Sequence, residues 1–204
     1  MKKKVVSFLV SGRGSNFRIV AEKILSGKIS ADFGCVISNR SDAPALEIAR
    51  SLGIKAYSVE SKKYFTRKGH EKALVRLLEQ HGTDLVVAAG YMRILTPYII
   101  RKYKNRMINI HPALLPSFPG INAQKQAIEY GVRISGCTVH FIDEGTDTGP
   151  IIIQKAVDIE KNDTASSLSK KILEEEHNLL PEAVKLFCSD RLVVSGRKVD
   201  ILST

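Results

Sequence analysis

The chain has no tryptophan and only three cysteines, Cys35, Cys137 and Cys188, among its 204 residues. Three cysteines cannot all pair internally, and no two of them stand close enough in sequence for a CxxC pair or a zinc knuckle. This scarcity excludes a disulfide framework and a cysteine-based zinc site. It favours a reduced, cytoplasmic setting.

Long hydrophobic runs are also missing. After the basic start Met1 to Lys4, the apolar stretch Val5 to Val10 leads directly into Ser11-Gly12-Arg13-Gly14. Such a stretch is too short for a signal peptide or a membrane span. We therefore expect a soluble protein without a targeting segment and without a membrane partner.

Negative charge is in deficit, with 21 aspartates and glutamates against 31 lysines and arginines, a formal net charge of +10. This excess favours anionic partners. The basic residues are scattered, and no basic and aromatic run suitable for stacking bases is present, so we expect an anionic small molecule and no nucleic acid. The alternative from another class is a non-catalytic module that binds anions or nucleic acid, and steeply salt-dependent binding would distinguish it.

The length and the composition, 44% hydrophobic and 25% charged, suit one globular domain, without internal repeats or linkers. In the first half, short β-branched runs alternate with helical patterns, which is typical of a parallel sheet with crossover helices. A glycine follows each predicted helix (Gly27, Gly53, Gly82), as at many helix C-termini. The predicted strands are 5–10, 33–38, 55–59, 85–89 and 107–110, and the predicted helices are 16–26, 43–52 and 64–81.

The pattern changes after Ile110. Residues 109–120 hold three prolines and a glycine, which predicts a rigid irregular loop. A short helix (123–130), two extended runs (135–142 and 150–158) joined by an acidic loop, and a long amphipathic helix opened by Asp163 are predicted to follow. The predicted fold class is α/β: a Rossmann-like open, mostly parallel sheet with helices on both faces, then a C-terminal mixed-sheet extension and a long helix.

The first predicted strand ends in Ser11-Gly12-Arg13-Gly14-Ser15-Asn16 before a helix begins. Glycines there allow close approach of an anion, and a helix N-terminus attracts phosphate. The loop departs from a dinucleotide fingerprint, because Phe17 holds the third glycine position and the second strand ends in Ser38-Asn39-Arg40, without an acidic residue. A tight turn capped by Ser15 or Asn16 is the structural alternative.

Asn109 and His111 stand two residues apart at the end of a predicted strand, so their side chains can share one side of the sheet. Open parallel sheets bind ligands at such strand ends. An amide beside an imidazole suits acyl transfer, because both groups stabilise an oxyanion and the imidazole also moves protons. A carboxylate from Asp147 near His111 would favour the charged imidazole; its alternative is a solvated turn aspartate. His140, Asp143 and Glu144 have the residue types of a metal cluster, but His140 in an alternating strand is more simply a packed or hydrogen-bonded side chain, and we expect no metal. His70 is expected on the surface of its helix.

Four segments together carry a family resemblance: SGRGSN at 11–16, GYMRIL at 90–95, NIHPALLPSFPG at 109–120 and GCTVHFIDEGTDTGPIIIQ at 136–154. They resemble the formyltransferases that use 10-formyltetrahydrofolate, and within them the phosphoribosylglycinamide formyltransferases of purine biosynthesis. The resemblance runs to about Arg191. It implies a single formyltransferase domain over 1–204, with a phosphate-binding half (1–108), a catalytic and folate-binding half (109–191) and a tail (192–204).

The resemblance also implies the substrates and the site. The formyl group would pass from 10-formyltetrahydrofolate, as co-substrate, to the amine of 5-phosphoribosylglycinamide by direct attack. The implied catalytic residues are Asn109, His111 and Asp147, and the implied acceptor residues are Gly14, Ser15, Asn16 and Glu176. The implied folate residues are Arg67, Met92, Arg93, Ile94, Leu95, Asn109, Asp143, Glu144 and Asp147. A monomer or a homodimer is expected.

One departure from the family pattern lies at Gly120-Ile-Asn-Ala-Gln124, where family members often carry a histidine. Any auxiliary role of that histidine is absent here or taken by Gln124. The rival enzymes are formyltransferases acting on initiator methionyl-tRNA or an amino sugar, and a hydrolase that releases formate. The tRNA enzyme is expected to need a further C-terminal domain and the hydrolase a further N-terminal one. This sequence predicts neither domain.

Overall fold

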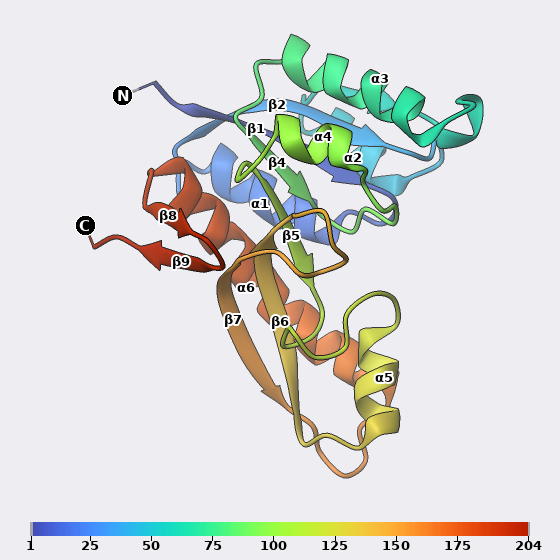
Figure 1. Ribbon diagram of the computed structural model, residues 1–204, viewed down its shortest axis with the longest axis vertical. Coiled ribbons are helices and arrows are strands. Elements are labelled where there is room, and N and C mark those ends of the chain that lie inside the picture. Colours follow the sequence, from blue (N-terminus) through green and yellow to red (C-terminus); the bar gives the residue numbers. More distant parts are fainter. Residues whose placement is uncertain (1, 204) are drawn as a thin grey trace.

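The computed structural model describes residues 2–203 and shows one open sheet of seven strands in the order β3-β2-β1-β4-β5-β6-β7 (Figure 1). Strands β1 to β5 pair in parallel, and β6 and β7 extend the sheet in antiparallel pairing. The predicted fold class is therefore confirmed. The strands are β1 Lys4–Val10, β2 Ala31–Ser38, β3 Ala56–Ser58, β4 Leu85–Ala88, β5 Met107–His111, β6 Ile134–Phe141 and β7 Ile151–Asp158.

Helices cover both faces of the sheet (Figure 1). Val6, Phe8 and Val10 of β1 pack in one core with α1, α2 and α6, whereas Leu9 packs in the other core with α3 and α4. This alternation follows from the two-residue period of a strand. The helices are α1 Ser15–Leu25, α2 Pro44–Ser51, α3 Arg67–Gln80, α4 Pro97–Lys102, α5 Ala123–Tyr130 and α6 Ala165–Cys188.

Three elements differ from the sequence prediction. Helix α3 begins at Arg67, three residues later than predicted, because a short 3₁₀ turn (η1, Ser61–Lys63) precedes it and the Thr66 side chain caps it by accepting a hydrogen bond from the Gly69 N–H at 3.0 Å. Helix α4 was not predicted. A C-terminal hairpin, β8 Leu192–Ser195 and β9 Lys198–Ile201, was not predicted either.

The pairing of β5 with β6 positions the polar side chains at the centre of the sheet. Asn109 lies directly opposite His140, and His111 lies directly opposite Thr138. Opposed residues of an antiparallel pair project from the same face. The neighbours of Asn109 in sequence, Ile108 and Ile110, pack in the α1 and α6 core. The four polar side chains therefore face the side that carries α3 and α4.

Among residues 2–203, no helix combines the length and the apolar character needed to cross a bilayer.

Candidate active site

A cavity of about 640 Å³ lies at the carboxyl ends of β4 and β5. One wall is polar and consists of Asn109, His111, His140 and Asp147. Much of the rest of the lining is apolar and comes from the segment 90–95 that follows β4, together with Ile100, Ile121 and Ile142. This volume suits a drug-sized or cofactor-sized ligand.

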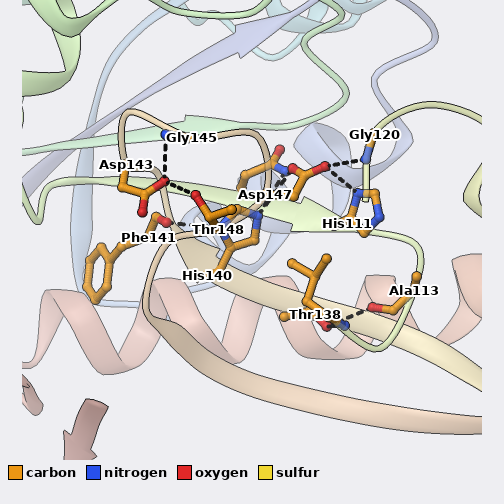
Figure 2. Close-up of polar contacts among 12 residues, drawn as sticks. His111, Ala113, Gly120, Thr138, His140, Phe141, Asp143, Gly145, Asp147 and Thr148 are labelled. Atoms are coloured by element: carbon orange, nitrogen blue, oxygen red, sulfur yellow. Dashed lines mark hydrogen bonds and ion pairs between the residues drawn. The ribbon is translucent and has the colours of Figure 1, made fainter. Parts of the chain in front are cut away.

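His111 is 4% exposed, and both of its ring nitrogens have polar neighbours, of which Figure 2 shows Asp147. Nδ1 lies 3.3 Å from Asp147 Oδ2, and Nε2 lies 2.8 Å from the carbonyl oxygen of Phe118. Both neighbours are acceptors. A neutral imidazole has one N–H donor and an imidazolium has two, so the charged form satisfies both contacts.

Asp147 lies in the loop between β6 and β7, in a left-handed backbone conformation with φ of 55°. The Asp143 carboxylate shapes this loop by accepting hydrogen bonds from Gly145 N at 3.1 Å and Thr148 Oγ1 at 2.7 Å (Figure 2). Asp147 Oδ2 accepts a further bond from Gly120 N at 2.8 Å. Burial raises the pKa of Asp147, but the His140 contact, the Gly120 N–H and the nearby His111 outweigh it and hold the pKa below its usual value.

His140 belongs to the same cluster, although the sequence placed it only as a packed or hydrogen-bonded strand residue. It is 2% exposed, and its Nδ1 donates to the Phe141 carbonyl at 2.9 Å. Its Nε2 lies 3.3 Å from Asn109 Nδ2 and 3.7 Å from Asp147 Oδ1. Only the strand register, which places His140 opposite Asn109, shows that His140 belongs to the site, and the sequence alone does not give this register.

The segment 12–16 forms a tight turn between β1 and α1. Gly14 occupies the N-cap position of α1 with φ of 77°, and no side chain caps the helix. The alternative from the sequence, a turn capped by Ser15 or Asn16, is therefore wrong. A β-carbon on Gly14 would lie 2.5 Å from the Ala45 β-carbon. The turn therefore requires glycine here, and the first N–H groups of α1 remain without a capping side chain.

Asn16 and Glu176 meet across α1 and α6. Asn16 Nδ2 donates to Glu176 Oε2 at 2.7 Å, whereas Asn16 Oδ1 is buried without a hydrogen-bond partner among residues 2–203. Burial raises the pKa of Glu176, and the bond from Asn16 opposes this in part. Two residues far apart in sequence thus present a polar pair near the turn at 12–16.

The residues that the resemblance assigns to folate divide into two groups. Met92 to Leu95, Asn109, Asp143 and Asp147 line the cavity. Glu144 instead forms an ion pair with Arg101, Oε1 to Nε at 2.7 Å, and Arg67 is exposed at the first turn of α3, so neither is part of the lining. Gln124 lines the cavity at the position of the departure from the family pattern.

His70 corrects an expectation, since the sequence suggested a residue on the helix surface. It is 2% exposed, and its Nε2 lies 2.9 Å from the Val59 carbonyl oxygen. The next residue, Glu71, is equally buried and accepts hydrogen bonds from the backbone N–H and the hydroxyl of Thr96. Helix α3 therefore anchors the far end of the cavity segment.

The raised pKa of Glu176 gives a testable effect on stability. A carboxyl group with a folded-state pKa above its usual value of 4.5 opposes folding once the pH exceeds that value, and it has no such effect below it. Glu176→Gln is therefore expected to raise Tm by a few degrees at pH 7 to 8 and to leave it unchanged near pH 4, as measured by calorimetry. Glu174→Gln, at an exposed position of α6, is the control and should show no such pH dependence. A lower Tm for Glu176→Gln at pH 8 would contradict the argument.

An open α/β sheet with an amide, two imidazoles and a carboxylate at its strand ends is a scaffold for group transfer, and residues 3–184 match the Formyl transferase family. The chain belongs to this family of enzymes. It is 38% identical over 185 residues to the phosphoribosylglycinamide formyltransferase of Bacillus subtilis (strain 168), covering 91% of this chain and 94% of that protein. The glycinamide ribonucleotide transformylase 1 from Symbiobacterium toebii superposes with a TM-score of 0.97 at 44% identity, covering 98% of this chain and 95% of that one.

A longer relative is the trifunctional purine biosynthetic protein adenosine-3 of Bos taurus. It is 40% identical over 198 residues, which cover 96% of this chain and 20% of that protein. The chain thus spans about a fifth of the trifunctional protein's length.

Proposed function

We propose that this chain transfers the formyl group of 10-formyltetrahydrofolate to the amine of 5-phosphoribosylglycinamide in purine biosynthesis. The observation that carries the proposal is the gathering of Asn109, His111 and Asp147 on one wall of the cavity, from positions 38 residues apart or less. The names of the relatives in Bacillus and Symbiobacterium support the same activity.

The cavity suits the donor. Its apolar lining at Ile94, Leu95, Ile100 and Ile142 matches a flat heteroaromatic ring, and the polar wall lies where the formyl group would be held. In this proposal the residues Met92 to Leu95 and Asp143 bind the folate. Glu144 acts on the loop through Arg101, and Arg67 is available to a ligand that extends beyond the cavity mouth.

The turn at 12–16 suits the acceptor. The uncapped N–H groups at the start of α1 and its positive helix end provide a site for the acceptor's phosphate. The unpartnered Asn16 Oδ1 can accept a hydrogen bond from the acceptor, and Glu176 lies beside it on the amine side. Gly14, Ser15, Asn16 and Glu176 are therefore the proposed acceptor residues.

The proposed chemistry is direct transfer. The amine nitrogen attacks the formyl carbon and forms the new C–N bond, and the carbonyl oxygen takes up negative charge. Asn109, which keeps a second N–H beyond its contact with His140, and the charged His111 stabilise that oxygen. His111 Nε2 exchanges the Phe118 carbonyl for the oxyanion. Asp147 keeps His111 charged and accepts the amine's proton through a water molecule. The bond between the formyl carbon and the folate nitrogen then breaks, and the same water passes that proton from Asp147 to the departing nitrogen. No covalent enzyme intermediate forms.

The test is an absorbance assay of tetrahydrofolate release with purified protein, 10-formyltetrahydrofolate and different amines. 5-Phosphoribosylglycinamide is expected to be a good acceptor. Its riboside, which lacks the phosphate, should have a kcat/KM lower by about 100-fold, because the phosphate site is then unfilled. Formate release without any amine, or equal rates with the riboside or with initiator methionyl-tRNA, would contradict the proposal.

A further inference from the structure

The hydroxyl of Ser11 connects three neighbouring strand ends. Ser11 follows the central strand β1, which lies between β2 and β4 in the sheet, and it is 6% exposed. Its Oγ donates to Asn39 Oδ1 at 2.5 Å, at the end of β2. The same oxygen accepts a hydrogen bond from the backbone N–H of Met92 at 2.8 Å, in the segment that follows β4. A serine hydroxyl has one proton, so the bond to Asn39 orients its lone pair toward Met92.

Each side of this connection leads to a different part of the proposed site. On one side Ser11 is joined directly to the turn at 12–16, which holds the acceptor in the proposed function. On the other side the Met92 N–H belongs to the segment 90–95, which lines the donor cavity. Met92 is 74% exposed as a residue, so the backbone bond, and not packing of its side chain, fixes the segment here.

Two further polar anchors, one within the segment and one directly after it, lie farther along the chain and on the α3 side. Arg93 Nη1 donates to Ser61 Oγ at 2.8 Å, and Thr96 N donates to Glu71 Oε1 at 2.6 Å. Neither anchor contacts the turn at 12–16. Gly90, in a left-handed conformation with φ of 73°, lies at the start of the segment and allows it to change direction there.

We propose that Ser11 is a positioning residue that couples the binding of the two substrates. When the acceptor orders the turn at 12–16, the bond from Met92 to Ser11 stabilises the segment 90–95 that lines the donor cavity. When the donor orders that segment, the same bond stabilises the turn. This inference rests on the proposed function, because it takes its two ligands from it. The coupling is a property of two binding equilibria and is distinct from the chemistry at His111. One hydrogen bond of this kind is expected to change affinity by about two- to tenfold.

The experiment measures the Kd of 5-phosphoribosylglycinamide by calorimetry, without folate and with saturating tetrahydrofolate, which cannot donate a formyl group. The ratio of the two Kd values is expected to be about two to ten in the unmodified chain and close to one in Ser11→Ala. Linkage requires that the same ratio appear when tetrahydrofolate is titrated with and without the acceptor. Asn39→Ala, which leaves the hydroxyl unoriented, should also lower the ratio and serves if Ser11→Ala does not fold.

Ser7→Ala is the matched control. Ser7 lies on the same strand and is fully buried, and its Oγ bonds to Thr83 Oγ1 at 2.7 Å and to the Cys35 N–H at 3.0 Å, away from the site. It should lose stability while keeping the unmodified ratio. If the acceptor still binds, either of two results overturns the coupling: an unchanged ratio of Kd values in both Ser11→Ala and Asn39→Ala, or a ratio of one in the unmodified chain. Absence of any acceptor binding to the unmodified chain overturns the proposed function and the coupling with it.

Discussion

His111→Ala is expected to lower kcat by about 10²- to 10⁴-fold, the usual contribution of a positioned acid or base group. The variant removes the imidazole that lies 3.3 Å from Asp147 and, in the proposed mechanism, stabilises the oxyanion. The KM values for both substrates should change by less than about threefold, because this interaction forms in the transition state. Steady-state kinetics with each substrate varied in turn measure both parameters.

The control for this variant is His81→Ala, which removes a histidine at the end of α3 whose Nε2 bonds to the Tyr57 hydroxyl at 2.9 Å. This control should retain nearly full kcat. If His111→Ala kept kcat within tenfold of the unmodified chain, the imidazole would not be part of the chemistry. Circular dichroism and Tm separate that result from a loss of folding.

Asp147→Asn is expected to lower kcat by about 10²- to 10³-fold while the cavity keeps its shape. The amide oxygen can still accept the Gly120 N–H, which lies 2.8 Å from Oδ2, so the loop is held. The negative charge beside His111 and His140 is lost, and with it the group that keeps His111 charged in the proposed mechanism. The variant therefore separates the charge of Asp147 from its role in the fold.

The depressed pKa of Asp147 sets the sign of a stability effect. A carboxylate with a folded-state pKa below its usual value of 3.8 stabilises the fold above that value, and this stabilisation disappears as the pH falls through the folded-state pKa. The loss of Tm in Asp147→Asn should therefore be present at pH 5 to 8 and become smaller as the pH falls below 3.8. Asp158→Asn, at an exposed position of β7, is the control and should show neither effect. A full kcat for Asp147→Asn at neutral pH would refute the role of the charge.

Apart from helix α4, the order of elements in the first half followed from the sequence because local chemistry determines it. Gly27, Gly53 and Gly82 all adopt the positive φ expected after a helix, and the apolar run 5–10 forms a buried strand. Helix α4 was missed because its six residues, Pro97–Lys102, are too few to show a helical period of apolar residues. The C-terminal hairpin was missed because its turn, at Gly196, joins two runs of four residues.

The site was predictable where its residues lie close in sequence. The two-residue spacing of Asn109 and His111 and the proline after them indicated a strand end, and both side chains do line the cavity. His140 was placed outside the site, because only the pairing of β5 with β6 brings it opposite Asn109. His70 was misplaced for a similar reason: a helical period does not show that Val59 and α4 cover that face.

The antiparallel register of β5 and β6 has a consequence for changes in chain length. A deletion within β6 that shifts its pairing by one residue would place Val139 or Phe141 opposite Asn109 and turn His140 toward α6, since alternate side chains exchange faces. An insertion in the α5 connection, outside the paired strands, leaves every opposed pair in place. The pairing of Asn109 with His140 thus tolerates a longer α5 connection. It does not tolerate a one-residue shift of β6.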